Sequence, residues 1–484
     1  MRKLENLKPE RVFYYFEELS KIPRESGNEK AVCDFLISTA KKLNLDVYQD
    51  KTMNVLIKKA ATKGYENSKG VILQGHVDMV CEKTLESTHN FLRDGIDLII
   101  DGDYLRANNT TLGADNGIAI AMALAILEDK TLEHPQIELL ATVEEETTMN
   151  GALYLEDNIL NGELLINIDS EEEAILTAGS AGGKSIEVNI SESKKELDKN
   201  NFSSFKLELK NLFGGHSGAE IHKNRLNANK VLAELLSLVK NSFDIKLNHV
   251  EGGSKDNAIP RDAFANISLS KEQVKDFKIG LDKIFNDLEN KYKVSEKNIS
   301  FNCTEITDTS SVFSDEFFNN YLSLVNTIPT GVNTWMKEYP DIVESSDNLA
   351  IVKTKGNEIS ILTSLRSSEP SVLEELLNKI ITIAKNHKAT YTISGGYPEW
   401  RFRSTSVLRD TAVKTYEKLF NEKMEVTVIH AGLECGAISQ HYPNLDMISI
   451  GPNIYDVHTP KEKMEIKSVE KYYNYLVELL KNLK

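Results

Sequence analysis

The sequence predicts an α/β protein with a mixed, largely parallel sheet flanked by helices, into which a second domain of α+β type is inserted. The N-terminal third alternates segments of helical spacing with short apolar runs such as Val71–Leu73, which are typical of strands buried on both faces. The middle of the chain instead shows period-two patterns such as Phe205–Leu209, which favour a half-exposed sheet. The first kind of pattern returns near the C-terminus. A chain of 484 residues is too long for one core, so two or three domains are expected.

The elements of the N-terminal third follow from apolar spacing and from local stop and start signals. A helix is expected over residues 9–22, and Ser26-Gly27-Asn28-Glu29 has the pattern of a capping box that opens a second helix to about residue 43. The segment Leu112–Asp129 is rich in Ala, Ile, Leu and Met, which is typical of a buried helix. The expected strands of this third are residues 46–48, 54–57, 71–73, 137–143 and 164–168.

Two changes of composition predict the domain boundaries. After Ala181-Gly182-Gly183 the chain becomes rich in Lys, Glu and Ser, and Ser394–Pro398 is a second, turn-rich break. Beyond that break we expect a helix over 405–420, an apolar strand over 447–451 and a final helix over 466–480. Residues 1–183 and 398–484 are therefore predicted to form one discontinuous domain, and residues 184–397 an inserted domain long enough for two subdomains.

Composition excludes several classes of protein. Hydrophobic residues make up 40% and charged residues 27%, which is ordinary for a globular protein. No run of 18 apolar residues suggests a membrane span, and the N-terminus lacks the apolar core of a secretory signal. The 4 cysteines form no CxxC pair, so we expect a reduced, cytoplasmic protein. A formal net charge of −16 argues against nucleic-acid binding.

An ordered set of acids and imidazoles carries the chemistry. Most of its members follow an apolar strand or open a helix, and they are His76, Asp78, Asp115, Glu145, Glu146, Asp169 and His458. In open α/β sheets, functional groups gather beyond the carboxyl ends of the strands. Imidazoles and carboxylates converging there would suit divalent metal ions. Metal-assisted hydrolysis is therefore the first hypothesis.

Several members of the set also have a simpler explanation, and Asp169, followed by Ser170-Glu171-Glu172-Glu173, could be surface charge. Asp78 could orient His76 by accepting from its ring, although a short His-x-Asp pattern is common without such a role. Asp115 stands at an expected helix start, where capping alone would explain it. Of the pair Glu145-Glu146, one carboxylate could bind metal while the other acts as general base, or both could be exposed loop acids. Their joint placement at strand ends favours a site.

One further histidine lies in an unusual context. His216 is flanked by glycines in Phe213-Gly214-Gly215-His216-Ser217-Gly218, and glycine lets backbone approach a ligand closely. A structural turn would explain the same pattern. The remaining histidines are expected to be surface or core residues.

Four motifs together resemble one family. They are Gly75-His76-Val77-Asp78-Met79-Val80, Thr111–Gly117, Asn167–Glu173 and His430-Ala431-Gly432-Leu433-Glu434-Cys435-Gly436. They look like the aminoacyl-histidine dipeptidases, PepD-like enzymes of the di-zinc peptidase family that includes carboxypeptidase G, acylases and carnosinases. The resemblance extends in order over nearly the whole chain. It implies a metallopeptidase catalytic domain and identifies the inserted domain as its lid.

The resemblance also implies roles for individual residues. It places His76, Asp115 and Asp169 on one side of a centre of two divalent ions, most simply Zn²⁺ with Mn²⁺ or Co²⁺ as substitutes, and Glu146 and His458 on the other. Asp115 would bridge the ions. The catalytic residues would be Glu145 as general base, Asp78 as the group that orients His76, and His216 as the group that polarises the scissile carbonyl. Substrate would be held by Asn257, Arg366 and Glu434, the last through a free amino group.

The implied reaction is cleavage of dipeptides with a free N-terminus, of Xaa-His type and with broad specificity. The alternatives are a tripeptidase or N-acyl amino acid deacylase on the same fold, or an inactive binding homologue. A small peptide is the expected partner, without nucleic acid or membrane, and a homodimer is compatible with the family. One position departs from the family pattern, because Thr148 stands where a glycine is usual, two residues after Glu146.

Overall fold

The computed structural model describes residues 2–198, 200–307, 311–337 and 340–484. The described chain divides into two compact units. Unit 1 comprises Met1–Ser180, Trp400–Val428 and Leu433–Lys484, and unit 2 comprises Ala181–Glu399 and Ile429–Gly432. The sequence predicts boundaries at 183/184 and 397/398 and places residues 429–432 in the first domain.

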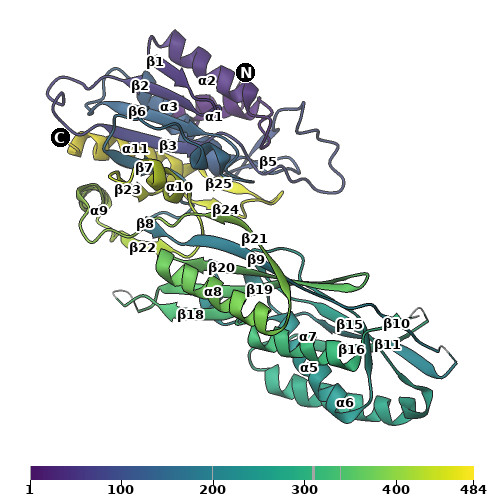
Figure 1. The fold of residues 1–484 in the computed structure, drawn as a ribbon. Helices are drawn as coiled ribbons and strands as arrows, with labels where there is room; N and C mark the ends of the chain where they lie inside the picture. The colour runs from purple at the N-terminus through teal and green to yellow at the C-terminus, as the bar shows by residue number, and fades with distance from the viewer. Residues whose placement is uncertain (1, 199, 308–310, 338–339) are drawn as a thin grey trace. The chain divides into compact units, whose positions relative to one another are not determined.

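Unit 1 is built on an eight-stranded mixed sheet of order β1-β2-β6-β3-β7-β23-β8-β22 (Figure 1). Its central strands β6, β3, β7 and β23 are parallel, and antiparallel pairs flank them. The strands are β1 Asp46–Gln49, β2 Val55–Lys59, β3 Val71–His76, β6 Ile137–Thr142, β7 Leu164–Asn167, β8 Ile175–Ser180, β22 Glu425–Ile429 and β23 Asp446–Ser449. The predicted mixed α/β fold is confirmed.

Helices cover both faces of this sheet. They are α1 Glu10–Ser20, α2 Lys30–Lys42, α3 Ala114–Glu128, α4 Asn150–Leu153, α9 Val407–Phe420, α10 Glu434–His441 and α11 Ile466–Asn482. A small antiparallel sheet adds β4 Leu98–Asp101, β5 Tyr104–Ala107, β24 Ile454–Tyr455 and β25 Lys463–Glu465. In β3, Val71 and Leu73 join the core on one face, whereas Ile72 joins a second core on the other. This two-sided burial explains why the strand is entirely apolar.

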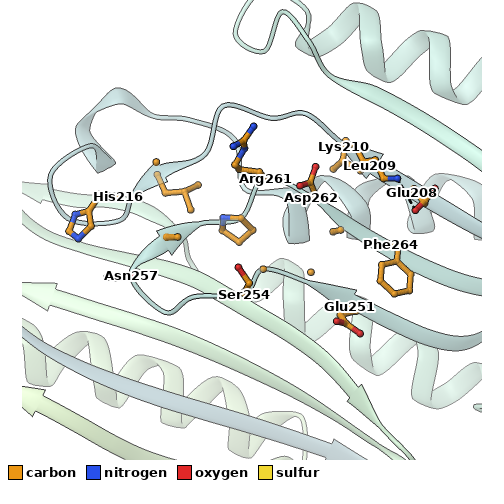
Figure 2. A pocket seen from close by; sticks show the side chains of 17 residues that line it. Glu208, Leu209, Lys210, His216, Glu251, Ser254, Asn257, Arg261, Asp262 and Phe264 are labelled. Carbon is orange, nitrogen blue, oxygen red and sulfur yellow. Dashed lines mark ion pairs between the residues drawn. The ribbon is translucent and has the colours of Figure 1, made fainter. Parts of the chain in front are cut away.

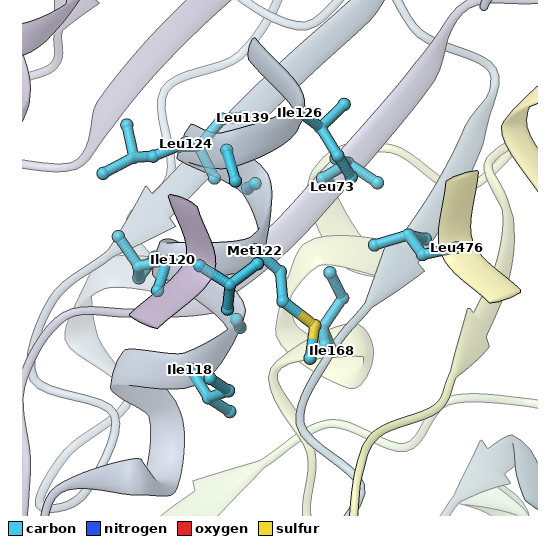
Figure 3. Close-up of a cluster of buried hydrophobic side chains, with 14 of the residues drawn as sticks. Leu73, Ile118, Ile120, Met122, Leu124, Ile126, Leu139, Ile168 and Leu476 are labelled. Carbon is cyan, nitrogen blue, oxygen red and sulfur yellow. The ribbon is translucent and has the colours of Figure 1, made fainter. Parts of the chain in front are cut away.

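Helix α3 lies at the centre of the larger core. Its side chains from Ile118 to Leu127 are all buried, and Figure 3 shows them packed with Leu73, Leu139, Ile168 and Leu476. A helix that is apolar on every side must be enclosed, as the sequence predicts.

Unit 2 is an antiparallel sheet with helices packed against it. Its main sheet has the order β16-β11-β15-β13-β19-β20-β9-β21, with β18 paired to β19. Its strands are β9 Gly182–Ser191, β11 Phe202–Lys210, β13 Lys246–Gly252, β15 Ala263–Ser270, β16 Ser300–Ile306, β18 Gly331–Trp335, β19 Val343–Lys355, β20 Glu358–Ser367 and β21 Thr390–Tyr397. The helices are α5 Ala228–Ser242, α6 Val274–Tyr292, α7 Asp315–Thr327 and α8 Pro370–Asn386, and they share one apolar core with the strands.

Short elements complete unit 2. They are the pairs β10 Lys195–Glu196 with β17 Ser311–Val312 and β12 Gly215–His216 with β14 Ala258–Ile259, and the 3₁₀ turns Ile221–Lys223 and Lys271–Gln273. In the part of the chain that the structure describes, we find no helix long and apolar enough to cross a bilayer.

One local prediction is wrong. Ser26–Glu29 does not form a capping box, because α2 begins at Lys30 with Glu29 as its N-cap, and no side chain caps the first turn. The Glu29 carboxylate instead accepts the N–H groups of Gly27 and of Glu144, a residue far away in sequence. The Glu29 side chain therefore makes a tertiary contact with Glu144 instead of a capping-box hydrogen bond at the start of α2.

Candidate metal centre

The parallel centre of the sheet in unit 1 brings the predicted ligands to one edge. His76 is the last residue of β3, Glu145 and Glu146 follow β6, and Asp169 follows β7. In the register of these strands, His76 stands opposite Thr142 and Gln74 opposite Asn167. The carboxyl ends of the three strands therefore lie at one edge of the sheet, within two residues of one another, as they do around functional sites.

One group of candidate ligands surrounds His76. Its Nε2 lies 3.1 Å from Asp115 Oδ1 and 3.5 Å from Asp169 Oδ1. Glu145 Oε2 is 3.8 Å from the same nitrogen. The ligand atoms of His76, Asp115 and Asp169 are close enough to share one cation.

A second group surrounds His458. Its Nε2 lies 3.1 Å from Asp115 Oδ2 and 3.0 Å from Glu146 Oε2. Asp115 thus belongs to both groups and offers one carboxylate oxygen to each. It does not act as a helix cap, because the N-cap of α3 is Gly113 and the Asp115 side chain is directed at the two histidines.

The electrostatics of the cluster favour cations. Burial raises the pKa of Glu145 well above its usual value, and burial raises the pKa of Asp169 to about 6. Hydrogen bonds to Asp115 and Glu146 raise the pKa of His458 to about 11. The pKa of Asp115 is lowered. Burial alone would raise it, but the hydrogen bonds from His458 and His76 outweigh the effect of burial. These shifts mean that protons neutralise part of the negative charge of the cluster. Divalent ions would neutralise the same carboxylates and displace the protons.

An unsatisfied atom supports the same reading of the cluster. Glu146 Oε1 is buried and has no hydrogen-bond partner among the described residues. A buried carboxylate oxygen without a partner is costly. Because Glu146 Oε2 already contacts His458, the second oxygen remains available as a ligand. Imidazole nitrogens and carboxylate oxygens form a donor set that fits zinc or a similar divalent ion.

Asp78 contacts residues of both groups of candidate ligands. Its Oδ1 is 3.4 Å from Nδ1 of His76, and its two oxygens accept the backbone N–H groups of Glu145 at 3.1 Å and Glu146 at 3.2 Å. One buried carboxylate therefore fixes both an imidazole and the backbone of the adjacent acid pair. Partners of this kind set the tautomer and ring orientation of a metal-binding histidine.

Glu462 holds the loop that carries Asp115. Its carboxylate, almost fully buried, accepts the backbone N–H groups of the four residues Leu112–Asp115 at 2.7, 3.0, 2.8 and 3.3 Å. Gly113 adopts a φ of +69°, and a Cβ there would lie 2.4 Å from Nη2 of Arg24. Only glycine fits this position, both for its backbone conformation and for the close approach.

Glu434 ends a row of buried polar side chains at the same sheet edge. Gln74 Nε2 donates to Glu434 Oε2 at 2.6 Å, and Thr142 Oγ1 donates to the same oxygen at 2.8 Å. Glu434 Oε1 is buried and has no partner among the described residues. Burial raises the pKa of Glu434 to about 7.

The row continues across the neighbouring strands. Asn167 Nδ2 donates to Gln74 Oε1 at 2.6 Å, and Ser449 Oγ donates to Asn167 Oδ1 at 2.5 Å. Ser170, the residue after Asp169, contacts the Ser449 hydroxyl at 3.0 Å. The polar row thus extends from Glu434 to the neighbour of a candidate ligand.

Unit 2 holds the other three predicted residues. Nδ1 of His216 accepts the N–H groups of Gly218 at 3.2 Å and Ala219 at 2.9 Å, which places the ring proton of a neutral imidazole on Nε2. His216 in β12 pairs with Ala258 in β14, next to Asn257. His216 and Asn257 line a cavity of about 590 Å³ (Figure 2).

Arg366 is close to His216 within unit 2. A Cβ on Gly218 would lie 3.1 Å from Cε1 of His216 and 3.2 Å from Nη1 of Arg366. Nη1 of Arg366 donates to the Tyr397 hydroxyl at 2.5 Å, while its buried Nε has no partner among the described residues. Burial, with the nearby Arg366 charge, lowers the pKa of His430 to about 3, so that imidazole is neutral.

Sequence reasoning missed the residues that support these loops. They are Arg24, Ser26, Glu29, Gln74 and Glu462. The partners that give them this role lie 52 to 360 positions away, and the capping pattern of Ser26 and Glu29 indicates a different role. The polar Gln74 inside the otherwise apolar strand Val71–Gly75 is the one signal that could have been noticed.

Comparisons with known proteins agree with the motifs. A model of Peptidase family M20/M25/M40 matches residues 72–482. The cytosol non-specific dipeptidase of Escherichia coli (strain K12) is 36% identical over 483 residues, which cover 100% of this chain and 99% of that protein. The crystal structure of aminoacylhistidine dipeptidase from Vibrio alginolyticus has a TM-score of 0.88 at 36% identity, covering 99% of this chain and 97% of that one.

A more distant structure shares the fold alone. It is a tripeptidase from Staphylococcus aureus subsp. aureus Mu50, with a TM-score of 0.57, 16% identity and 99% coverage of both chains. The family resemblance predicted from the motifs is confirmed, and the chain belongs to Peptidase family M20/M25/M40.

Proposed function

We propose that this peptidase cleaves dipeptides with a free N-terminus at a centre of two divalent metal ions. The observation that carries the proposal is the position of Asp115, whose two carboxylate oxygens contact two different histidines. The identity of 36% along the whole chain to a cytosol non-specific dipeptidase supports the substrate class and a cytoplasmic location.

The ion ligands would be His76 and Asp169 on one side, Glu146 and His458 on the other, and Asp115 between them. Zinc is the simplest choice for this donor set, and manganese or cobalt could substitute. When bound, such ions polarise a carbonyl oxygen and lower the pKa of a coordinated water towards about 7.

Glu145 would act as the general base. Its carboxylate lies 3.8 Å from Nε2 of His76, and its backbone N–H is held by Asp78. From this position Glu145 would take a proton from the attacking water and pass it to the leaving amine. Asp78 would keep the His76 ring in the tautomer that presents Nε2.

The remaining residues would bind the substrate. His216 carries its ring proton on Nε2 when neutral, so it could donate to the oxyanion that forms at the scissile carbonyl. Arg366 and Asn257 would hold the C-terminal carboxylate or the peptide backbone. Glu434 has a buried oxygen without a partner, which a substrate ammonium group would satisfy.

The finer specificity rests on relatives. The aminoacylhistidine dipeptidase from Vibrio alginolyticus suggests Xaa-His substrates, whereas the name of the Escherichia coli relative suggests broad specificity. A related tripeptidase or deacylase activity is the nearest alternative, and a homodimer is compatible with the proposal. Glu434 argues against deacylation, because a blocked amine would leave its charge unpaired.

A substrate panel tests the proposal. The protein is stripped with a chelator, reloaded with Zn²⁺, Mn²⁺ or Co²⁺, and assayed on Xaa-His dipeptides, other dipeptides, a tripeptide and N-acetylated dipeptides. We expect hydrolysis of free dipeptides only, dependent on the added metal. If the N-acetylated dipeptides or the tripeptide are cleaved faster than the free dipeptides, the proposed substrate class is wrong. If no metal supports cleavage of any substrate in the panel, the proposed function is wrong.

A further inference from the structure

The segment between α1 and α2 contacts the loops around the candidate metal centre. Its residues Arg24, Ser26 and Glu29 contact three loops, which follow His76, precede Asp115 and carry Glu145 and Glu146. A parallel bridge between Glu25 and Met79 aligns the segment with the loop that follows β3. Although its sequence has the pattern of a capping box, no side chain of the segment caps the first turn of α2.

Arg24 joins the first two loops. It is 2% exposed, and its Nη1 donates to the carbonyl groups of Val77 and Asp78, both at 2.9 Å. Its Nη2 donates to the carbonyl of Gly113 at 2.5 Å, two residues before Asp115. One rigid guanidinium thus sets the spacing between the loop after His76 and the loop before Asp115.

Ser26 and Glu29 reach the loop that carries the acid pair. The Ser26 hydroxyl donates to Oδ2 of Asp78 at 2.7 Å, and the same oxygen accepts the N–H of Glu146. Glu29 Oε1 accepts the N–H of Glu144 at 3.2 Å. The backbone of residues 144–146 is therefore held by Asp78, which Ser26 supports, and directly by Glu29.

Glu144 needs this support because its backbone is strained. It has a φ of +56°, which is unfavourable for a residue with a side chain. Its carboxylate is held from the other side by Thr148 at 2.9 Å and Asn150 at 2.7 Å. Thr148, the departure from the family pattern, thus contributes to the same turn. The turn sets the direction in which the next two side chains leave the strand.

We propose that Ser26 and Glu29 are positioning residues that hold the acid pair Glu145-Glu146 in the geometry needed to bind metal and to move the proton, with Arg24 fixing the neighbouring loops. This inference rests on the proposed two-metal function for its kinetic consequence. The predicted change in metal affinity requires only that Glu146 binds a metal ion, and does not depend on dipeptidase activity. Loss of a partner behind a ligand typically costs about 10–100-fold in metal affinity or activity.

The test uses four single variants of the full chain. Ser26→Ala and Glu29→Ala each remove the hydrogen bonds. Glu29→Gln is the conservative variant, because its amide oxygen can still accept both backbone N–H groups. Lys30→Ala is the matched control, since Lys30 is exposed and pairs with Asp34 on the helix surface. For each variant, Co²⁺ binding to the metal-free protein is titrated by absorbance, and kcat and KM are measured at saturating Co²⁺.

We expect Glu29→Ala to lose about 10–100-fold in Co²⁺ affinity and in kcat, with KM changed less than about twofold. Ser26→Ala should lose about 10-fold, while Glu29→Gln and Lys30→Ala should behave as the unmodified protein. Lower stability to urea with unchanged Co²⁺ affinity and kcat would mean a structural role only and would overturn the proposal.

The outcomes separate this inference from the proposed function. If the unmodified protein cleaves no dipeptide but Glu29→Ala still loses Co²⁺ affinity, the function fails and the positioning role stands. If the protein is an active dipeptidase and neither variant changes, the positioning role fails alone. If Glu29→Ala does not fold, Ser26→Ala decides, because it removes one hydroxyl at the edge of the segment.

Discussion

The substitution Glu462→Ala should destabilise unit 1 even without metal. The Glu462 carboxylate is 2% exposed and accepts four consecutive backbone N–H groups, from Leu112 to Asp115. These donors precede or open α3, so the helix itself cannot satisfy them. Removing the carboxylate leaves them buried without partners.

The magnitude follows from the geometry. A buried donor left unsatisfied costs about 1–3 kcal/mol. Three of the bonds are 3.0 Å or shorter and the fourth is 3.3 Å, so three full bonds are at stake. They share one carboxylate and are not additive, and water entering the space left by the side chain would satisfy part of them. We expect a loss of about 2–4 kcal/mol in the free energy of unfolding. Glu462→Gln should lose about half as much, because one oxygen remains.

The two tryptophans make the assay specific for unit 1. Trp400 is buried in unit 1 and Trp335 is exposed in unit 2, so in a Trp335→Phe background the fluorescence reports unit 1 alone. Urea unfolding is followed in this background with a chelator present. Glu470→Ala, which removes an exposed carboxylate from α11, is the control. If Glu462→Ala unfolds within about 0.5 kcal/mol of the background, the range for neutral surface substitutions, the reasoning is refuted.

The remaining predictions concern the proposed mechanism. Glu145→Gln should keep its metal and lose about 10²–10⁴ in kcat, and near-normal turnover at full metal content would exclude it as general base. Asp115→Ala should be the most damaging ligand change, and metal analysis that finds two equivalents in this variant would exclude the bridging role. His216→Ala should keep metal and lose about 10²–10³ in kcat. Inactive His216→Ala and Glu145→Ala chains, mixed under subunit exchange, should stay inactive if His216 acts within its own chain, and restored activity would show that it acts in trans.

Most of the framework of unit 1 could be predicted from local pattern. The predicted strand Val71–Leu73 extends to His76, and the predicted helix 112–129 becomes Ala114–Glu128. These predictions are confirmed because burial on both faces leaves an unmistakable apolar signature. The predicted ligands also meet in space, since strands β3, β6 and β7 are parallel neighbours and end within two residues of one another.

The supporting contacts could not be predicted in the same way. Ser26 and Glu29 match a capping pattern, yet Ser26 binds Asp78 and Glu29 binds the backbone of Glu144. Glu462 satisfies a helix start about 350 residues earlier in the chain. The partner of each of these groups depends on which loops the sheet brings together. A local pattern can therefore name the ligands of a strand-end site but not the groups behind them.

The row of polar side chains that begins at Glu434 can be recognised only once the order and register of the strands are known. Gln74, Asn167 and Ser449 lie at one level of three adjacent strands, and Thr142 lies two residues further along the fourth strand, opposite His76. An ionised Glu434 can only accept, so Gln74 must turn its NH₂ towards it and its oxygen towards Asn167. Asn167 must then present its NH₂ to Gln74 and accept from Ser449. The charge of one carboxylate thereby fixes the direction of every bond in the row. The row in turn holds one oxygen of Glu434 and leaves the other for a cationic partner.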